Sequence, residues 1–199
     1  MTALVKAARQ EIRNDPSWLI ARKMWEVQGI ISHVKRREKK EDYIGLKAFR
    51  ALTEHLTHPL TVLDMGCGYG RFSFLLAEKG LNVTGIDKDP VAIRIANRAR
   101  KYLGWENLKF KKGTIDTVKG KFDRIFYGFV LHDMVEHSIE EIEKARAHLT
   151  LQGKIIILDY EKGFEKLKSC YTVHVLQELG KASHDGVELW NVYLVELLE

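Results

Sequence analysis

Apolar residues in the second half of the chain recur with two different spacings. Short apolar segments are typical of strands and occur at residues 60–63, 81–87, 108–110, 122–130 and 154–159. Wider apolar spacings between them predict helices, which cover residues 72–76, 90–102 and 138–149. Gly80 stands where the first helix would end, and Asp89-Pro90 is typical of a helix start. Strands that alternate with helices predict a parallel, doubly wound α/β sheet.

The last part of the chain allows two interpretations. The favoured one is a helix over residues 164–179 that ends at Gly180, then a short strand, a turn at Asp185-Gly186 and a last strand over 188–197. The final hairpin would add an antiparallel edge to the sheet. In the alternative, residues 171–179 belong to a strand.

The first 58 residues differ from the rest in rhythm and in charge. Their apolar spacing predicts helices, which cover residues 3–13, 18–40 and 43–56. This segment has 12 Lys and Arg against 7 Asp and Glu, whereas residues 59–199 have 20 of each. We therefore predict a helical appendage over 1–58 and an α/β domain over 59–199. Basic appendages occur on proteins that contact RNA, membranes or acidic substrates, but a solvated helix surface is the favoured interpretation because the charge is modest.

Length and composition are those of an ordinary globular chain. A chain of 199 residues can bury about 70% of its unfolded surface, so it needs no disulfide or metal to fold. Cys67 and Cys170 form no metal-binding spacing. No apolar run approaches the ~20 residues of a membrane span, and no leader with a cleavage site is evident. We therefore expect a cytoplasmic protein, and the pattern does not specify its oligomeric state.

A glycine-rich turn joins the first strand to the first helix. Gly66, Gly68 and Gly70 occupy alternate positions, and Asp64 precedes them in the pattern D-x-G-x-G-x-G. Glycine lets the chain turn sharply and pass close to a ligand, and the following helix start offers free N–H groups. Dinucleotide-binding folds use G-x-G-x-x-G instead. A carboxylate at Asp64 would also repel a pyrophosphate, so the turn favours a cationic ligand.

The pattern resembles motif I of the class I S-adenosylmethionine-dependent methyltransferases, and the resemblance covers roughly residues 60–160. It implies an enzyme with the Rossmann-like methyltransferase fold. That fold has a mostly parallel, seven-stranded, doubly wound sheet with an antiparallel last strand, here with N-terminal helices added. The cofactor would be S-adenosylmethionine. In the family, the acid of motif I faces the methionyl end of the cofactor, which carries an ammonium and a sulfonium.

Three further positions match places where the family binds its cofactor. Asp87, 21 residues after Gly66, stands at the end of the second strand, where a carboxylate accepts hydrogen bonds from ribose hydroxyls. Asp116 follows the third strand, where the family places a polar group near the adenine amine, although Asp116 could instead cap a turn. Tyr127 begins a segment that resembles motif IV, beside the transferred methyl group. The predicted cofactor-binding residues are Asp64, Gly66, Cys67, Gly68, Gly70, Asp87, Lys88, Ile115, Asp116 and Tyr127.

The motif IV segment also indicates the class of acceptor. Residues 127–133, Y-G-F-V-L-H-D, contain neither the Asn/Asp-Pro-Pro-aromatic tetrad of amino-methylating nucleic-acid enzymes nor a Pro-Cys nucleophile. They look more like the small-molecule branch related to quinone C-methyltransferases. We therefore expect in-line transfer to a small-molecule acceptor. Two alternatives stay open: an RNA or protein acceptor held by the basic N-terminal helices, and a non-catalytic subunit that binds the cofactor for a partner.

Two residues are candidates for a direct role in transfer. His132 could accept a proton from the acceptor, or it could simply cap the next helix. Tyr43 could cover the methionyl end of the cofactor, or it could be an ordinary packing residue. A metal site built from His132, Asp133 and His137 is not expected, because too few carboxylates gather there. A nucleophilic role for Cys67 is not expected either, since a small residue between these glycines fits packing.

Overall fold

The computed structural model describes residues 50–52, 54, 56, 60–182 and 190–198. The helices predicted over residues 3–13 and 18–40, most of the helix over 43–56, Tyr43 and the turn at 185–186 lie outside the described residues. Arg50, Ala51, Leu52 and Glu54 are helical, as predicted for the end of the third helix.

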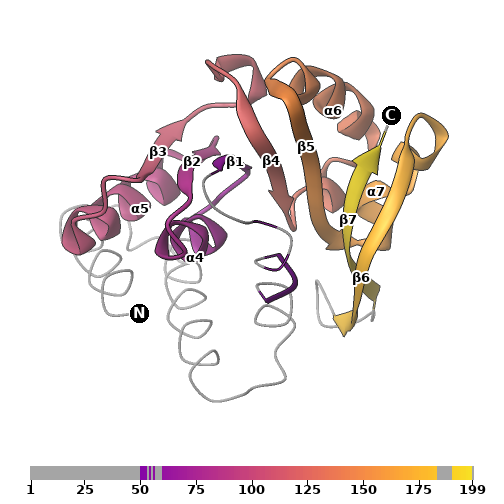
Figure 1. The fold of residues 1–199 in the computed structure, drawn as a ribbon, viewed down its shortest axis with the longest axis horizontal. Coiled ribbons are helices and arrows are strands. Elements are labelled where there is room, and N and C mark those ends of the chain that lie inside the picture. Colours follow the sequence, from indigo (N-terminus) through magenta and orange to yellow (C-terminus); the bar gives the residue numbers. More distant parts are fainter. Residues whose placement is uncertain (1–49, 53, 55, 57–59, 183–189, 199) are drawn as a thin grey trace, which may run out of the picture.

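Seven strands form one sheet, in the order β3-β2-β1-β4-β5-β7-β6 (Figure 1). The strands are β1 (Thr61–Met65), β2 (Asn82–Asp87), β3 (Leu108–Lys112), β4 (Phe122–Gly128), β5 (Leu149–Tyr160), β6 (Thr172–Ala182) and β7 (Trp190–Leu198). The helices are α4 (Arg71–Glu78), α5 (Pro90–Leu103), α6 (Ser138–Arg146) and α7 (Glu161–Phe164). Short 3-10 turns lie at η2 (Ile115–Thr117), η3 (Leu131–Asp133), η4 (Val135–His137) and η5 (Lys166–Ser169).

The sheet is parallel except for β7, which runs antiparallel between β5 and β6. Helices α4 and α5 cover one face, and α6 and α7 cover the other (Figure 1). Neighbouring residues of a strand point to opposite faces, so Val62 packs in the cluster with α4 while Leu63 packs in the cluster with α6. Burial on both faces explains why these strands are almost continuously apolar. The predicted doubly wound fold is confirmed.

The favoured prediction for residues 164–179 is wrong, and the alternative strand is confirmed. Only α7 and η5 are helical in this region, and β6 begins at Thr172. β6 pairs along its length with β7, with register shifts near Val175 and Glu178. Pairing with a distant strand overrides the local helical spacing. Pairing with β4 also extends β5, which begins at Leu149, five residues before the predicted start. The preceding helix α6 therefore ends early, at Arg146.

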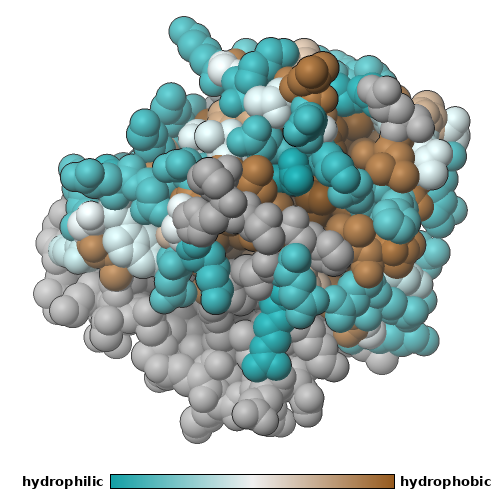
Figure 2. Space-filling view, viewed as in Figure 1, coloured by the Kyte–Doolittle hydropathy of each residue, from teal (hydrophilic) through white to brown (hydrophobic). Residues whose placement is uncertain are grey.

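The described surface in Figure 2 is mostly hydrophilic, and apolar residues gather toward the side where β5, β6 and β7 lie. Leu151, Val175 and Leu198 of these strands have exposed side chains. Scattered apolar side chains are normal on a globular surface and do not by themselves mark a binding site. No helix in the described part of the chain has the length and apolarity of a membrane span.

The glycine turn needs its glycines for two different reasons. Gly66, Gly68 and Gly70 all have positive φ, at 66°, 52° and 83°. A Cβ on Gly70 would also overlap the ring of Phe110, and one on Gly66 would overlap the side chain of Val130. A Cβ on Gly68 would meet no atom within 4 Å. Gly68 is therefore required for backbone conformation alone, while the other two are also required for packing.

This difference predicts unequal stability losses on substitution by alanine. Gly104, which ends α5 at φ 67° with no atom near its would-be Cβ, supplies a matched control. Gly104→Ala should lower the free energy of unfolding by about 1–2 kcal/mol through left-handed strain. Gly70→Ala should lose about 1–3 kcal/mol more, because the added methyl overpacks against Phe110. Urea denaturation of both variants measures the difference, and equal losses would contradict the packing argument.

Candidate functional site

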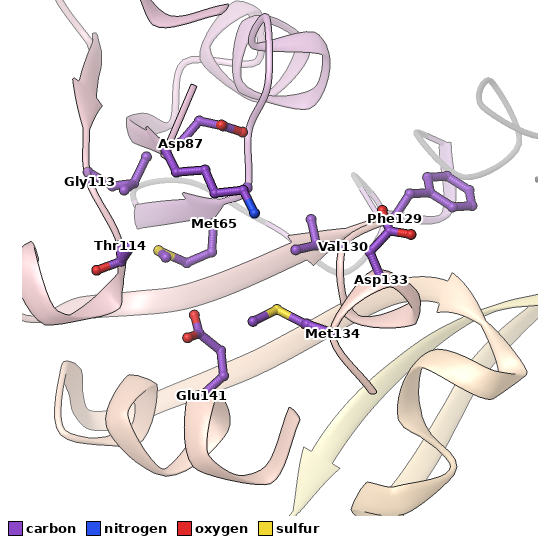
Figure 3. A pocket seen from close by; sticks show the side chains of 12 residues that line it. Met65, Asp87, Gly113, Thr114, Phe129, Val130, Asp133, Met134 and Glu141 are labelled. Carbon is purple, nitrogen blue, oxygen red and sulfur yellow. The ribbon is translucent and has the colours of Figure 1, made fainter. Parts of the chain in front are cut away.

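A cavity of about 290 Å³ opens at the carboxyl ends of the central strands (Figure 3). It is lined by Met65, Gly66, Ile86, Asp87, Lys88, Gly113, Thr114, Phe129, Val130, Asp133, Met134 and Glu141. The strand order reverses direction between β1 and β4, and open α/β sheets bind ligands at such a switch point. The cavity therefore lies where the fold predicts a ligand.

Asp87 joins the end of β2 to the glycine turn. Its Oδ2 accepts a hydrogen bond from the backbone N–H of Gly68 at 2.7 Å, and its Oδ1 accepts from the N–H of Asp89 at 2.8 Å. Each carboxylate oxygen keeps a further lone pair for another donor. Asp87 is thus held in a fixed orientation at the cavity wall, on the side opposite Glu141 (Figure 3).

Of the three glycines of the motif, only Gly66 borders the cavity directly. Gly66 lines it, whereas the N–H of Gly68 is bonded to Asp87. Gly70 precedes α4, and its N–H donates to the carbonyl of Cys67. The Cys67 side chain is buried in the apolar cluster on the α4 face, and burial raises the pKa of its thiol well above the usual range.

Asp64 lies behind the cavity wall and not in it. Its side chain is 2% exposed, and its Oδ2 accepts a hydrogen bond from Ser73 Oγ. Burial raises the pKa of Asp64 to about 7, against the lowering effect of the Ser73 hydrogen bonds, and the negative charge of Asp87 raises it slightly further. Near neutral pH this carboxyl is therefore poised to lose its proton when a cation approaches.

The segment after β3 reaches the cavity through a different residue from the one predicted. Asp116 is exposed and lies 3.0 Å from Lys144 Nζ, which also lies 2.9 Å from Glu140 Oε1. The side chain of Ile115 is buried in the core on the α6 face. Neither residue lines the cavity, whereas Thr114, which the sequence did not single out, does.

Tyr127 approaches the cavity through Glu141. The tyrosine is fully buried, and its hydroxyl donates to Glu141 Oε1 at 3.1 Å. Burial raises the pKa of Glu141 above its usual range, although the Tyr127 hydrogen bond opposes this shift. The sequence did not predict Glu141 as a site residue, because it lies in an acidic run on α6 that resembles a solvated helix face.

Phe129 has an unusual backbone conformation at the end of β4. Its φ is 59°, and no other non-glycine residue in the described part of the chain has a positive φ. This conformation is costly for an aromatic residue and tends to occur at functional sites. The ring lies 5.4 Å from that of Tyr160 and 6.4 Å from that of Phe72, measured between centroids. No sequence signal indicates this geometry.

His132 is anchored by a buried carboxylate that the sequence analysis missed. Its Nδ1 lies 2.6 Å from Oδ1 of Asp159, the last acid of the apolar strand β5. Asp159 is fully buried and also accepts backbone N–H groups, from Val130, Leu131, His132 and Tyr160. His132 does not line the cavity, but its Nε2 lies 3.5 Å from Asp133 Oδ1, and Asp133 does. Among the described residues, no cluster of three His, Cys, Asp or Glu side chains could hold a metal ion.

Residues 56–194 match the family model described as a methyltransferase domain. The match covers more than half of the chain, and the chain belongs to this family, the class I S-adenosylmethionine-dependent methyltransferases. Methyltransferases of this kind use S-adenosylmethionine, so the family implies this cofactor.

Three curated relatives share part of the sequence. The ubiquinone/menaquinone biosynthesis C-methyltransferase of Zymomonas mobilis is 25% identical over 167 residues, which is 80% of this chain and 65% of that protein. The O-antigen chain terminator bifunctional methyltransferase/kinase of Escherichia coli is 33% identical over 118 residues, 54% of this chain and 16% of that protein. The ribosomal protein L11 methyltransferase of Nitratiruptor is 27% identical over 131 residues, 65% of this chain and 45% of that protein. The chain spans less than two thirds of the length of each.

Solved structures have the same fold. A methyltransferase from Pyrococcus furiosus has a TM-score of 0.59 at 24% identity, covering 77% of this chain and 82% of that one. The precorrin-6y C5,15-methyltransferase of Geobacter metallireducens has a TM-score of 0.57 at 18% identity, covering 77% and 87%. At these identities the likeness concerns the fold alone.

The contacts of Asp159 predict a large stability loss for Asp159→Asn. The amide would replace an acceptor oxygen with a donor NH₂ facing backbone N–H groups or His132, so we expect a loss of about 3 kcal/mol or more in the free energy of unfolding. Asp133→Asn is the control, because its side chain is 67% exposed and should change stability by no more than about 0.5 kcal/mol. Similar losses in the two variants, measured by urea denaturation, would show that Asp159 does not hold the turn after β4.

Proposed function

We propose that this chain transfers a methyl group from S-adenosylmethionine to a small-molecule acceptor by in-line displacement. The observation that carries the proposal is the cavity at the switch point, which Gly66 and the fixed carboxylate of Asp87 border together. A nucleoside bound there would meet a close backbone approach at Gly66 and a ribose acceptor at Asp87.

The charge of the lining supports a cationic ligand. Three carboxylates line the cavity, Asp87, Asp133 and Glu141, against the single ammonium of Lys88. Asp64 adds a fourth ionisable carboxyl behind the wall. This excess of negative charge attracts an ammonium and a sulfonium and repels a pyrophosphate.

The chain's own residues bind and orient the reactants. Bound S-adenosylmethionine would supply an electrophilic methyl group on a good leaving group. Asp87 would hold the ribose, and the backbone at Gly66 would lie against the cofactor. With the leaving group already activated, the protein needs chiefly to position the acceptor and exclude water.

Two observations favour a small-molecule acceptor. The wall beside the end of β4 is formed by Phe129 and Val130, an apolar surface suited to an organic acceptor. The segment 127–133 lacks the tetrad of nucleic-acid enzymes, and a quinone C-methyltransferase is among the relatives. A protein acceptor is the second candidate, because a ribosomal protein L11 methyltransferase is also a relative. Two roles stay predictions: His132 as the base that accepts a proton from the acceptor, and Tyr43 as the residue that covers the methionyl end of the cofactor.

Transfer of a radiolabelled methyl group separates these acceptor classes. The purified chain is incubated with methyl-labelled S-adenosylmethionine and a panel of phenols and hydroquinones, and in parallel with ribosomal protein and RNA. We expect label in organic-extractable product. Label only in acid-precipitable macromolecules would overturn the small-molecule acceptor, and cofactor binding without transfer to any acceptor would favour a non-catalytic subunit.

Removal of the ribose acceptor should weaken cofactor binding. Asp87→Ala should cost about 1–3 kcal/mol in S-adenosylmethionine affinity, because charged hydrogen bonds are lost. Asp89→Ala is the matched control. It removes the side-chain cap of α5, which accepts from the N–H of Val91, but it does not line the cavity. Calorimetry should therefore show reduced affinity only for Asp87→Ala, and unchanged affinity there would count against the ribose assignment.

The raised pKa of Asp64 predicts a pH-dependent affinity. Because its pKa in the free protein is about 7, a bound cation must displace a proton at lower pH, so affinity for S-adenosylmethionine should fall as pH drops through 7. The fall should approach about tenfold at pH 6 relative to pH 8. Asp64→Asn removes this titration, so calorimetry across the range should give a flatter profile in the variant. Parallel profiles in the two proteins would exclude Asp64 as the responsive group.

A further inference from the structure

Glu141 is the carboxylate at the end of the cavity nearest β3 and α6. It extends from α6 toward the space beside Thr114, with Met65 and Met134 adjacent (Figure 3). Two thioethers and an aliphatic wall form a polarisable apolar surface, which suits a flat heterocycle. At this end of the cavity, the Glu141 carboxylate can accept a hydrogen bond from the edge of such a ring.

The contacts of Glu141 leave it able to accept another hydrogen bond. Tyr127 donates to Oε1 from the rigid centre of the sheet, which fixes the carboxylate without supplying a counter-charge. Lys144, one turn along α6, is instead placed between Asp116 and Glu140. Among the described residues no cation lies within ion-pair distance of Glu141. Its Oε2 therefore retains acceptor capacity toward the cavity.

The other polar contacts fix which part of the cofactor would lie here. Asp87 and Gly66 line the part of the cavity assigned above to the ribose and its neighbouring groups. Along the sheet edge, the next strand end beyond β2 is that of β3, followed by Gly113 and Thr114. The base of the nucleoside would therefore point toward Thr114 and Glu141.

Resting on the proposed function, we propose that Glu141 recognises the exocyclic amino group of adenine and so selects the adenine cofactor over 6-oxo purines. An amine at position 6 is a donor toward the carboxylate, whereas a 6-oxo group presents an acceptor and is repelled. The assignment replaces Asp116, whose side chain is paired with Lys144 outside the cavity lining. Tyr127 is a positioning residue in this arrangement, since it acts through Glu141.

Calorimetry with two probes tests the assignment independently of activity. S-adenosylhomocysteine and its 6-oxo analogue S-inosylhomocysteine are titrated into the full chain, Glu141→Gln and Asp116→Asn. The parent should prefer the adenine form by about tenfold or more. Glu141→Gln should reduce this preference by about tenfold, because the carboxamide can rotate to donate its NH₂ to the 6-oxo group. Asp116→Asn should keep the parent preference.

The outcomes separate this inference from the function on which it rests. Failure of the parent to bind either probe overturns the proposed function and the inference together. Normal binding of the adenine probe with an unchanged preference in Glu141→Gln, or a lost preference in Asp116→Asn, overturns the inference alone. If Glu141→Gln does not fold, Tyr127→Phe provides the test, because it releases Glu141 from its anchor. The preference of Tyr127→Phe for S-adenosylhomocysteine over S-inosylhomocysteine should then be smaller than that of the parent. An unchanged preference overturns the assignment.

Discussion

The hydrogen bond from the N–H of Gly68 to Asp87 is the contact on which the site depends. It ties the turn after β1 to the end of β2, and it adds to the backbone hydrogen bond from the N–H of Cys67 to the carbonyl of Ile86, which joins the same two segments. The turn that brings this N–H to the carboxylate passes through positive φ angles at Gly66 and Gly68. The same conformation presents Gly66 to the cavity. Together with the N–H of Asp89, which donates to the other carboxylate oxygen, this hydrogen bond fixes the orientation of Asp87 at the cavity wall.

Three buried or half-buried carboxylates differ in their hydrogen-bond donors and in their burial, and these differences suit them to different roles. Asp159 is surrounded by donors and fixes the turn after β4. Asp64 has fewer donors and full burial, so it is poised to titrate near neutrality. Asp87 stands at the cavity wall with lone pairs to spare. The number of donors and the degree of burial therefore make one kind of side chain suitable as a structural anchor, as a responsive charge or, as proposed for Asp87, as a ligand acceptor.

The sequence predicted the elements whose signal is local and missed the contacts that depend on distant partners. The doubly wound order, the glycine turn and the cap at Asp89 follow from short-range spacing and turn chemistry, and all are present. Most of β6 falls in the segment where local spacing favours a helix and leaves a strand as the alternative, because pairing with β7 leaves no trace in that spacing. No spacing in the sequence singles out Glu141, because the residue that holds its side chain, Tyr127, is fourteen residues away on another element. Because Glu141 lies in an acidic run, the sequence does not show which carboxylate of α6 will point into the cavity.

The end of β4 shows how one backbone angle distributes side chains between two parts of the cavity. In a regular strand, residues i and i+2 point to the same face, so Phe129 would follow Tyr127 toward α6. Tyr127 does pack on that face and holds Glu141 there. The positive φ of Phe129 sends its ring instead to the α4 face, where it packs against Phe72 and Tyr160. A strand that ended regularly would place both aromatic rings beside α6 and leave the opposite wall without one. The strain at Phe129 is therefore offset by packing on the α4 face, and the change of direction after β4 places Tyr127 and Phe129 on opposite faces of the sheet.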